Sequence, residues 1–411
     1  MYAWYKIGLI SKVIIMKKTI RDFNLNNKKV LIRVDFNVPM KDKKIIDDNR
    51  IKESLETINY AIENNAKVIL FSHLGRIKEE SDLEKNSLEP VAKRLSELLN
   101  KEVKFSNETR GPILESMIEN MQKKDVILVQ NTRYEDLYGK QESKNDSDLG
   151  KYWASLGDIF INDAFGTCHR AHASNVGIAA NLPSGLGFLV EKEIKNLEIA
   201  LKDEIHPYTV ILGGAKVNDK IGVIESLAKK ADYLLIGGAM SYTFLKAQDK
   251  NIGKSLLDIE SIDFCKEMLE KYKGKIILPI DSVNSKEISS NKDVTTTDID
   301  NIKEDEIGLD IGPKTVELFK QYLEKSKLIV WNGTLGYSEI EEFKNGTVGV
   351  LEILKNIDAI KIIGGGDTAA SVINFGYKDT ITHISTGGGA SLEFLEGKKL
   401  PGIEAVDDID E

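Results

Sequence analysis

The stretch TVILGGAKVNDK at 209–220 combines residue types that can bind an anion. An apolar run predicts a buried strand, Gly213 and Gly214 follow it, and Lys216 and Lys220 are spaced to share one face of a following helix. Glycine lets the backbone approach a ligand closely, and a helix N-terminus offers free N–H donors to an anion such as a phosphate. The alternative is a tight turn that needs glycine for its geometry, with two solvated lysines. This stretch alone favours neither.

The second half of the chain repeats this ending in glycine. Apolar runs predict six strands there, and four of them end in two or three glycines. Turn geometry alone does not explain that number, so we predict a phosphate or nucleotide site at these strand ends. The polar segment 285–306 predicts a loop or a short antiparallel excursion. The predicted strands are 209–214, 232–238, 275–281, 327–333, 359–366 and 382–389.

Arginine marks the first half. All eight arginines lie between Arg21 and Arg170, and the rest of the chain uses only lysine. Because lysine suffices for a plain positive charge, the arginines indicate places that need a planar fork for carboxylate or phosphate. Chance and codon bias are the alternative. Polar residues follow the apolar runs 29–39, 67–76, 125–133 and 158–166, or in one case open a helix: Arg33, Asp35, Asn37, Arg50, His73, Arg76, Asn131, Arg133, Asp163, His169 and Arg170.

The elements that position these residues are predicted by the alternation of buried runs with amphipathic stretches such as 51–64 and 88–99. This pattern is typical of a parallel, doubly wound sheet with helices on both faces. Open sheets of this kind bind ligands at the carboxyl ends of their strands. We therefore predict that the arginines converge there on a strongly anionic small molecule. For any single arginine, a surface ion pair is the alternative.

Composition excludes several classes of protein. The 411 residues, 41% hydrophobic and 29% charged, predict a soluble globular protein large enough for two domains. A net charge of −9 argues against nucleic acid or an anionic membrane as the main partner. Cys168 and Cys265 give no disulfide framework and suit a reducing cytoplasm. The apolar N-terminus is broken by Lys6 and Lys12 and lacks a cleavage site, so we interpret residues 1–15 as an extension outside the fold.

The glycine-rich segment that precedes Asp367 is compatible with two nucleotide chemistries. There is no P-loop motif, but Gly364, Gly366 and Ala369 satisfy the relaxed dinucleotide fingerprint. The next predicted strand ends at 385–387 without the acidic residue that would bind ribose hydroxyls, so a nucleotide-dependent dehydrogenase is the second hypothesis. Asp367 suits a Mg²⁺ ion that bridges phosphates, and a helix N-cap is its alternative role.

Seven motifs agree in order and spacing with one known family. They are KVLIRVDFNVP at 29–39, SHLGR at 72–76, NTRYE at 131–135, NDAFGTCHRAHAS at 162–174, GGAKVNDKI at 213–221, GGGDT at 364–368 and STGGGASLE at 385–393. On these motifs the chain from Met16 to Glu411 resembles the phosphoglycerate kinases. One motif departs, because the family usually has proline after WNG, where this chain has Thr334.

The resemblance implies reversible transfer of a phosphoryl group from 1,3-bisphosphoglycerate to ADP, giving 3-phosphoglycerate and ATP, with Mg²⁺. It implies a cytoplasmic, glycolytic monomer that binds neither nucleic acid nor membrane. The residues it assigns to the three-carbon substrate are Asp35, Phe36, Asn37, Arg50, His73, Leu74, Gly75, Arg76, Arg133 and Arg170. Those it assigns to the nucleotide are Gly213, Gly214, Ala215, Lys216, Lys220, Gly238, Gly312, Asn332, Glu339, Gly365, Gly366, Asp367 and Thr368, with Asp367 on the metal.

The chemistry of such a reaction makes modest demands on side chains. The acceptor is a carboxylate, ionised at pH 7 because its pKa is near ~4, so no general base is needed. What remains is positioning and neutralisation of charge on the transferring group. We assign that role to Arg50 and Lys220, helped by the amides of Gly387, Gly388 and Gly389. A non-catalytic nucleotide-binding protein of the same fold is the third hypothesis.

The predicted fold is α/β, with two doubly wound parallel-sheet (Rossmann-like) domains joined by a helix hinge. PSGLG at 183–187 ends the first pattern, and 188–201 predicts a helix that leads into the second. We expect a 3-phosphoglycerate domain at 16–187, an interdomain helix at 188–203, a nucleotide domain at 204–395 and an acidic surface tail at 396–411. Since the two substrates would bind different domains, we predict hinge bending, with 191–201 and the STGGGAS segment as hinge elements.

Overall fold

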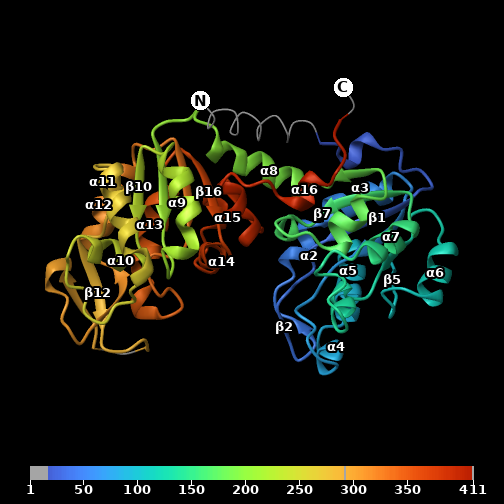
Figure 1. The fold of residues 1–411 in the computed structure, drawn as a ribbon, viewed down its shortest axis with the longest axis horizontal. Helices are drawn as coiled ribbons and strands as arrows, with labels where there is room; N and C mark the ends of the chain where they lie inside the picture. The colour runs from blue at the N-terminus through green and yellow to red at the C-terminus, as the bar shows by residue number, and fades with distance from the viewer. Residues whose placement is uncertain (1–16, 291–292, 410–411) are drawn as a thin grey trace. The chain divides into compact units, whose positions relative to one another are not determined.

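The computed structural model describes residues 17–290 and 293–409, so the extension predicted at 1–15 lies outside the described residues. Contacts divide the described chain into two compact units, one made of the residues up to Lys195 with those from Lys399 onward, and one made of Asn196–Lys398 (Figure 1). The division falls inside α8 (Phe188–Leu201), the helix expected between the domains. None of the described helices is both long and apolar enough to cross a lipid bilayer.

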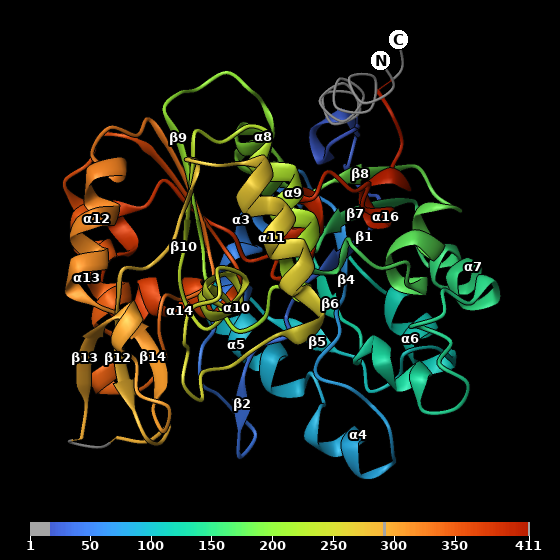
Figure 2. The ribbon, with the colours of Figure 1, turned by 60° about the vertical axis from the view of Figure 1, so that its left-hand side comes forward.

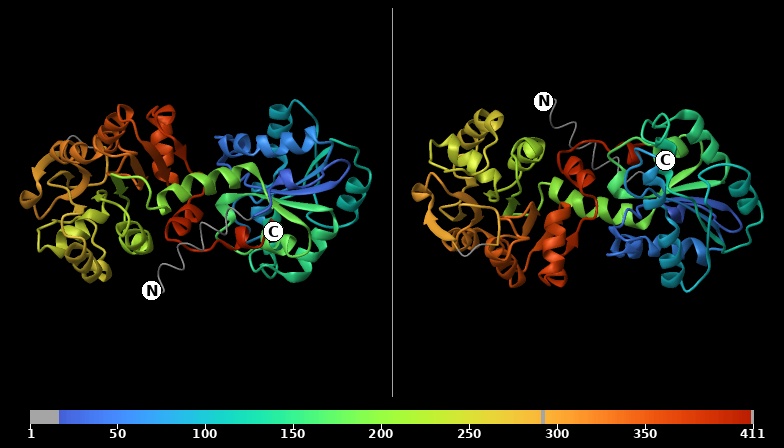
Figure 3. Two further views of the ribbon diagram at one scale, coloured as in Figure 1. Left: turned by 90° about the horizontal axis from the view of Figure 1, so that it is seen from above. Right: turned by 90° about the horizontal axis from the view of Figure 1, so that it is seen from below.

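The first unit is built on a six-stranded parallel sheet with the order β5-β6-β4-β1-β7-β8. Along β1, Val30 and Ile32 belong to one buried apolar cluster and Leu31 to another, as the two-residue period of a strand requires. Helices cover both faces of this sheet (Figure 3), so the predicted doubly wound arrangement is confirmed. The strands are β1 (Lys29–Val34), β4 (Lys67–Phe71), β5 (Val103–Phe105), β6 (Val126–Leu128), β7 (Ile159–Asp163) and β8 (Ser184–Leu186), and the helices are α2 (Asn49–Glu53), α3 (Leu55–Glu63), α4 (Ser81–Lys85), α5 (Glu89–Leu99), α6 (Pro112–Glu119) and α7 (Ser147–Ser155).

The edge strands β5 and β8 of this sheet are absent from the sequence prediction. Each has three residues, which is too short to show a period of hydrophobicity. The segment 183–187, predicted as a turn, contains β8, and Gly185 at its centre packs so closely that an added Cβ would lie 2.7 Å from the ring of Phe23. Glycine and proline in this segment are typical of a turn, and for that reason the sequence did not predict the strand.

The second unit contains all six strands that the sequence predicts in its half, in the parallel order β11-β10-β9-β15-β16-β17. The run at 275–281 is divided, because two of its residues form β11 and Asp281 begins a three-stranded antiparallel sheet (Figure 2). Of the two alternatives predicted for 285–306, the short antiparallel excursion is confirmed and the plain loop is not. The strands are β9 (Tyr208–Leu212), β10 (Tyr233–Ile236), β11 (Ile276–Ile277), β12 (Asp281–Ser285), β13 (Thr295–Asp298), β14 (Ile307–Ile311), β15 (Leu328–Asn332), β16 (Ile360–Gly364) and β17 (His383–Ile384), and the helices are α9 (Ile221–Ala228), α10 (Met240–Ala247), α11 (Ile262–Lys271), α12 (Pro313–Leu323), α13 (Asn345–Lys355), α14 (Gly366–Asn374) and α15 (Gly389–Leu395).

The C-terminal tail packs into the first unit. Leu400, Ile403 and Val406 are buried around α16 (Pro401–Glu404). Asn162 Nδ2 donates to the Gly402 carbonyl at 2.8 Å, which ties the tail to the end of β7. The prediction of a surface tail is therefore wrong for this part, because its spaced apolar residues outweigh its acidic composition.

Both parallel sheets change their direction of growth beside their first strand. From β1 the chain adds β4, β5 and β6 on one side and then β7 and β8 on the other. From β9 it adds β10 and β11 on one side, and later β15, β16 and β17 on the other. Ligands of open α/β sheets bind outside the carboxyl ends of the strands at such a point. The predicted site residues of each half follow these strands.

Candidate functional site

In the first unit, the loops after β1 and β4 are joined to each other. The two strands are adjacent and in register, with Arg33 opposite Phe71. Asn37 Oδ1 accepts a hydrogen bond from the Gly75 amide at 2.8 Å, and the Phe36 amide donates to Ser72 Oγ, also at 2.8 Å. The predicted segments 35–37 and 73–75 therefore form one rigid edge.

Arg50 reaches this edge from α2. Its Nη1 forms an ion pair of 2.5 Å with Asp35 Oδ2, and the Arg50 side chain remains 37% exposed. Burial alone would raise the pKa of Asp35, but Arg50, and after it His73 and Arg33, lower the pKa below its usual value. Asp35 is thus a fixed carboxylate that orients Arg50 and leaves part of the guanidinium accessible.

The loop after β6 supports the same edge. The Asn131 side chain accepts from the Leu74 amide at 3.1 Å and donates to the Leu74 carbonyl at 2.6 Å. Arg133 donates to Asp136 at 3.1 Å and to Ser143 Oγ at 2.7 Å, while its buried Nε has no acceptor within the described chain. Asn131 and Ser72 are structural members of this site that sequence reasoning left out of the binding residues. The position of Asn131 directly after a buried run was the available signal.

The remaining arginines of the expected group differ from one another. Arg76 and Arg170 are exposed, and Arg170 Nε donates to His169 Nε2 at 3.1 Å. Arg33 is instead fully buried, so it cannot itself touch a ligand from solvent. Burial first, and then the charges of Arg133, Arg33 and Arg170, lower the pKa of His172 to about 3, which places these cations around one region.

In the second unit, the glycines at the strand ends fall into two groups. An added Cβ would lie 2.1 Å from the Thr334 carbonyl at Gly213, and 2.2 Å from the Gly213 carbonyl at Gly333. Here backbone packs on backbone, and the fold itself requires glycine. At Gly366 and Gly388, nothing in the described chain lies within 4 Å of the added atom. The second group leaves open space beside the backbone, which a ligand can enter.

Lys220 lies between the ends of β9 and β15 and is only 8% exposed. Its Nζ donates to Oδ1 of Asn332 and, at 3.2 Å, to the Asn332 carbonyl. Burial lowers the pKa of Lys220 to about 8, although Asp367 and Asp219 act to raise it. Nδ2 of Asn332 is buried without an acceptor among the described residues, 3.0 Å from where a Cβ on Gly365 would be. A buried cation and an unpaired N–H donor are suited to an anion.

The N-terminus of α14 adjoins Lys220 and is open to solvent. Gly365 is its N-cap with φ +90°, and Gly366 and Asp367 are exposed. Asp367 lies within the first turn, so its alternative role as the N-cap is wrong. No hydrogen bond or ion pair within the described chain occupies its carboxylate. Thr368 is buried, and its Oγ1 accepts from the Gly333 amide at 2.7 Å, which fixes the helix to the loop after β15.

The two lysines of 209–220 do not share a helix face, and that prediction is wrong. α9 begins at Ile221, Lys216 is exposed in the preceding loop, and Lys220 is buried. The positive φ of Gly214, +95°, turns the chain after β9 and delays the helix.

The other residues predicted for the nucleotide lie at several places in the second unit. An added Cβ on Gly312, the N-cap of α12, would lie 2.3 Å from the Asp281 carboxylate, which caps that helix. The Thr334 carbonyl accepts from the Gly214 amide at 2.9 Å, a bond that the family's proline would also make. Exposed positions are Ala215, Glu339 and Gly389, Gly388 is half-buried, and Gly238 and Gly387 are buried.

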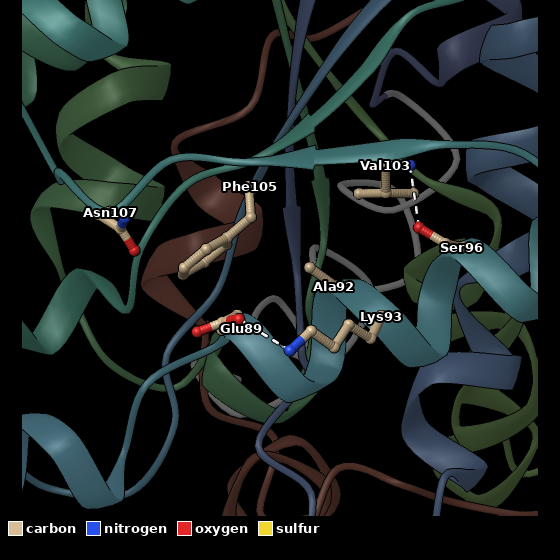
Figure 4. A pocket seen from close by; sticks show the side chains of 7 residues that line it. All are labelled: Glu89, Ala92, Lys93, Ser96, Val103, Phe105 and Asn107. Atoms are coloured by element: carbon tan, nitrogen blue, oxygen red, sulfur yellow. Dashed lines mark hydrogen bonds and ion pairs between the residues drawn. The ribbon is translucent and has the colours of Figure 1, made fainter.

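A separate hollow of about 360 Å³ lies between α5 and β5, where Glu89, Lys93, Ser96, Phe105 and neighbouring residues line it (Figure 4). It contains none of the predicted site residues. Glu89 and Lys93 pair with each other at 2.8 Å, and Ser96 Oγ accepts from the Val103 amide at 2.9 Å. These three polar side chains are thus already used within the protein.

Strand ends that carry arginines in one sheet, and strand ends that carry glycine and lysine in the other, are typical of an α/β enzyme of two Rossmann-like units that acts on anionic substrates. Comparison with known proteins agrees: the family model described as Phosphoglycerate kinase matches residues 20–398. The chain belongs to the phosphoglycerate kinase family. It is therefore a phosphotransferase with a carboxyl group as acceptor and a glycolytic enzyme, and the hypothesis of a dehydrogenase is replaced.

Individual relatives show the extent of the likeness. The chain is 60% identical over 395 residues to a phosphoglycerate kinase of Fusobacterium nucleatum, covering 95% of this chain and 99% of that one. It is 57% identical over 393 residues to a phosphoglycerate kinase of Listeria innocua, with the same coverage of 95% and 99%. The solved structure of phosphoglycerate kinase from Coxiella burnetii has a TM-score of 0.84 at 39% identity and covers 95% of this chain and 98% of that chain.

Proposed function

We propose that the first unit binds the three-carbon substrate, 3-phosphoglycerate or 1,3-bisphosphoglycerate, at the edge formed by 35–37, 73–75 and Arg50. The observation that carries this proposal is the pair of Arg50 with a buried, ionised Asp35, which holds a partly exposed guanidinium beside the loop after β4. Arg133 contributes a further cation, and the exposed Arg76 and Arg170 extend the positive region. Carboxylate and phosphate are the groups that such arginine forks bind in pairs.

The second unit binds ADP or ATP at the open ends of β9, β15 and β16. The N-terminus of α14 offers backbone N–H donors to a phosphate, and Lys220 supplies the buried charge. Exposed Lys216 and the free space beside Gly366 and Gly388 complete this side of the site. The exposed Asp367 carboxylate fits Mg²⁺, a hard cation that prefers oxygen ligands. When bound, Mg²⁺ neutralises charge on the phosphate oxygens.

The reaction needs no proton transfer in its central step. A carboxylate oxygen of 3-phosphoglycerate forms a bond to the γ-phosphorus of ATP, the bond from that phosphorus to the bridging oxygen breaks, and ADP leaves with the electron pair. Arg50 and Lys220 stabilise the charge on the transferring group, since preorganised cations act where charge develops. The reverse direction uses the same contacts.

A coupled assay with 3-phosphoglycerate and MgATP tests these assignments. We expect turnover by the purified chain. Asp367→Asn should need a higher Mg²⁺ concentration, because the amide lacks the negative charge of the carboxylate. Lys216→Met is the matched control, because it should weaken nucleotide binding and leave the Mg²⁺ requirement unchanged. No turnover would contradict the assignment of these substrates to the two units. An unchanged Mg²⁺ requirement in Asp367→Asn would remove the metal assignment alone.

The proposed sites lie in different units, so transfer requires a state in which the two bound substrates meet and water is excluded. We expect this closing motion to use α8, inside which the division between the units falls. We also propose that the enzyme is a cytoplasmic monomer. Small-angle X-ray scattering of this monomer should show a smaller radius of gyration when both substrates are bound. Unchanged dimensions in the ternary complex would contradict closure.

A further inference from the structure

A fully buried polar chain runs behind the proposed substrate edge of the first unit. Glu142, Ser174 and Arg33 have 0% exposed surface. Ser174 donates through its amide to Glu142 Oε2 at 2.9 Å and through Oγ to Oε1 at 2.5 Å. Ser174 Oγ in turn accepts from Arg33 Nε at 2.8 Å. The carboxylate therefore orients the serine, and the serine orients the guanidinium.

The far end of the guanidinium meets His73. Arg33 Nη1 donates to the Val34 carbonyl at 2.5 Å, and Nη2 lies 3.2 Å from His73 Nδ1. Guanidinium nitrogens only donate, so Nδ1 of the imidazole must be the acceptor. In the neutral ring the single proton is then on Nε2. A protonated ring would turn an N–H toward the N–H of Arg33, and the contact would become repulsive.

The surroundings of His73 favour the same state. Burial first, and then the charges of Arg33, Arg133 and Arg50, lower the pKa of His73 to about 3, although Asp35 acts to raise it. His172 is the other titratable neighbour. Between pH 5 and 9 the ring is neutral. His73 is nevertheless half-exposed, so part of the ring is accessible to a ligand.

We infer that Arg33 is a positioning residue that holds His73 as a neutral imidazole with its proton on Nε2, so that His73 gives the substrate a directed hydrogen bond and no charge. The inference rests on the proposed binding of 3-phosphoglycerate at 73–75. Lysine cannot replace Arg33, because one ammonium cannot serve three acceptors held in the plane of a guanidinium fork.

Nitrogen-15 NMR of histidine-labelled protein tests the state of the ring directly. In the free protein, His73 should show a protonated Nε2 and an unprotonated Nδ1, without titration from pH 6 to 8. Addition of 3-phosphoglycerate should shift the Nε2 signal. A protonated Nδ1 or a titrating ring would overturn the inference. A correct tautomer that does not respond to 3-phosphoglycerate would instead remove the substrate role proposed for His73.

Kinetics separate a neutral donor from a cation. His73→Ala should raise KM for 3-phosphoglycerate about 10-fold or more, the effect of losing a hydrogen bond to a charged group. His73→Gln, which keeps a neutral N–H near the place of Nε2, should recover most of that loss, and its KM ratio to the native enzyme should be constant from pH 6 to 8. This ratio cancels the ionisation of the substrate itself. If His73 acted as a cation, the ratio would change by up to tenfold per pH unit above the pKa of the ring.

Variants behind the ring test the role of Arg33. Ser174→Ala weakens the buried hydrogen-bond chain without removing its charges. Both this variant and Arg33→Lys should yield a mixture of His73 tautomers and a raised KM for 3-phosphoglycerate. KM for MgATP should be unchanged, since the second unit is not altered. Thermal unfolding establishes which variants fold, and Ser174→Ala is the milder of the two. A folded variant that keeps the pure Nε2–H tautomer would overturn the positioning role.

Discussion

Lys220→Met should destroy activity without costing the protein stability at pH 7. Methionine has a similar length and no charge to bury. Burial lowers the pKa of Lys220 from 10.5 to about 8, and at 1.36 kcal/mol per unit this corresponds to about 3 kcal/mol spent on keeping the charge inside the native protein at pH 7. The substitution removes this cost.

One loss opposes the gain. Asn332 Oδ1 would have no donor after the substitution, which costs about 1–3 kcal/mol for a buried acceptor. The Asn332 carbonyl keeps the Gly213 amide as its donor at 2.9 Å, so it adds nothing. The free energy of unfolding should therefore be unchanged or up to about 2 kcal/mol higher in Lys220→Met at pH 7. Turnover should fall about 10³-fold or more, as when a charge clamp is lost in phosphoryl transfer.

The pH dependence of the stability difference shows whether the buried charge of Lys220 is its cause. The native pKa lies below that of the unfolded chain, so the burial cost is fully present below pH 8, where lysine is charged in both states. Between about pH 8 and 10.5 the unfolded chain binds more protons than the native protein does. The free energy of unfolding therefore rises with pH in this range. The advantage of Lys220→Met should thus shrink by about 2 kcal/mol between pH 7 and 9.5.

Urea unfolding without nucleotide measures this, since bound ligand would stabilise the native state by mass action. Trp331, buried in the same unit, is the fluorescent reporter, with Trp4 and Trp153 replaced by phenylalanine in every variant. Lys216→Met is the control for stability because Lys216 is exposed. A loss of 2 kcal/mol or more at pH 7, or a stability difference that does not depend on pH, would refute the view of Lys220 as a buried charge kept for function.

The remaining predictions concern the first unit. Arg50→Ala should lower kcat about 10³-fold in the coupled assay and leave the circular dichroism spectrum native, because Arg50 is 37% exposed and lies in a site rather than a core; a lost spectrum would contradict this. Asp163→Asn should stabilise the protein against urea more at pH 8 than at pH 5. Burial raises the pKa of Asp163 from 3.8 to about 8, so its cost is absent below pH 3.8 and grows by up to about 1.4 kcal/mol per pH unit until pH 8. An equal effect at both pH values would show that Asp163 is already ionised.

The strand pattern of this chain was readable where strands are long and buried. β9, β15 and β16 are each five residues long, mostly apolar and largely buried, and glycine or asparagine marks their ends in the sequence. β5 and β8 escaped because three residues at a sheet edge carry no period. Their place is decided by neighbouring strands, which is tertiary information.

The candidate site was readable in its residue types but not in their division of labour. Arg33 and Arg50 look alike in the sequence, each close to the end of β1 in the fold, yet one is fully buried and the other partly exposed. The difference depends on Glu142 and Ser174, which are distant in the chain and provide the buried acceptors for Arg33. A single sequence contains no signal for such a pairing.

The glycine-ended strands show why a pattern can indicate the right chemistry for a partly wrong reason. Their number argued for a phosphate site, but Gly213 and Gly333 are required by each other, because each backbone occupies the space a side chain would need. This contact brings the ends of β9 and β15 together and creates the narrow place in which Lys220 is buried between them. In the nucleotide site that we propose, the glycines that pack therefore form the floor, and Gly366 and Gly388 leave the surface accessible.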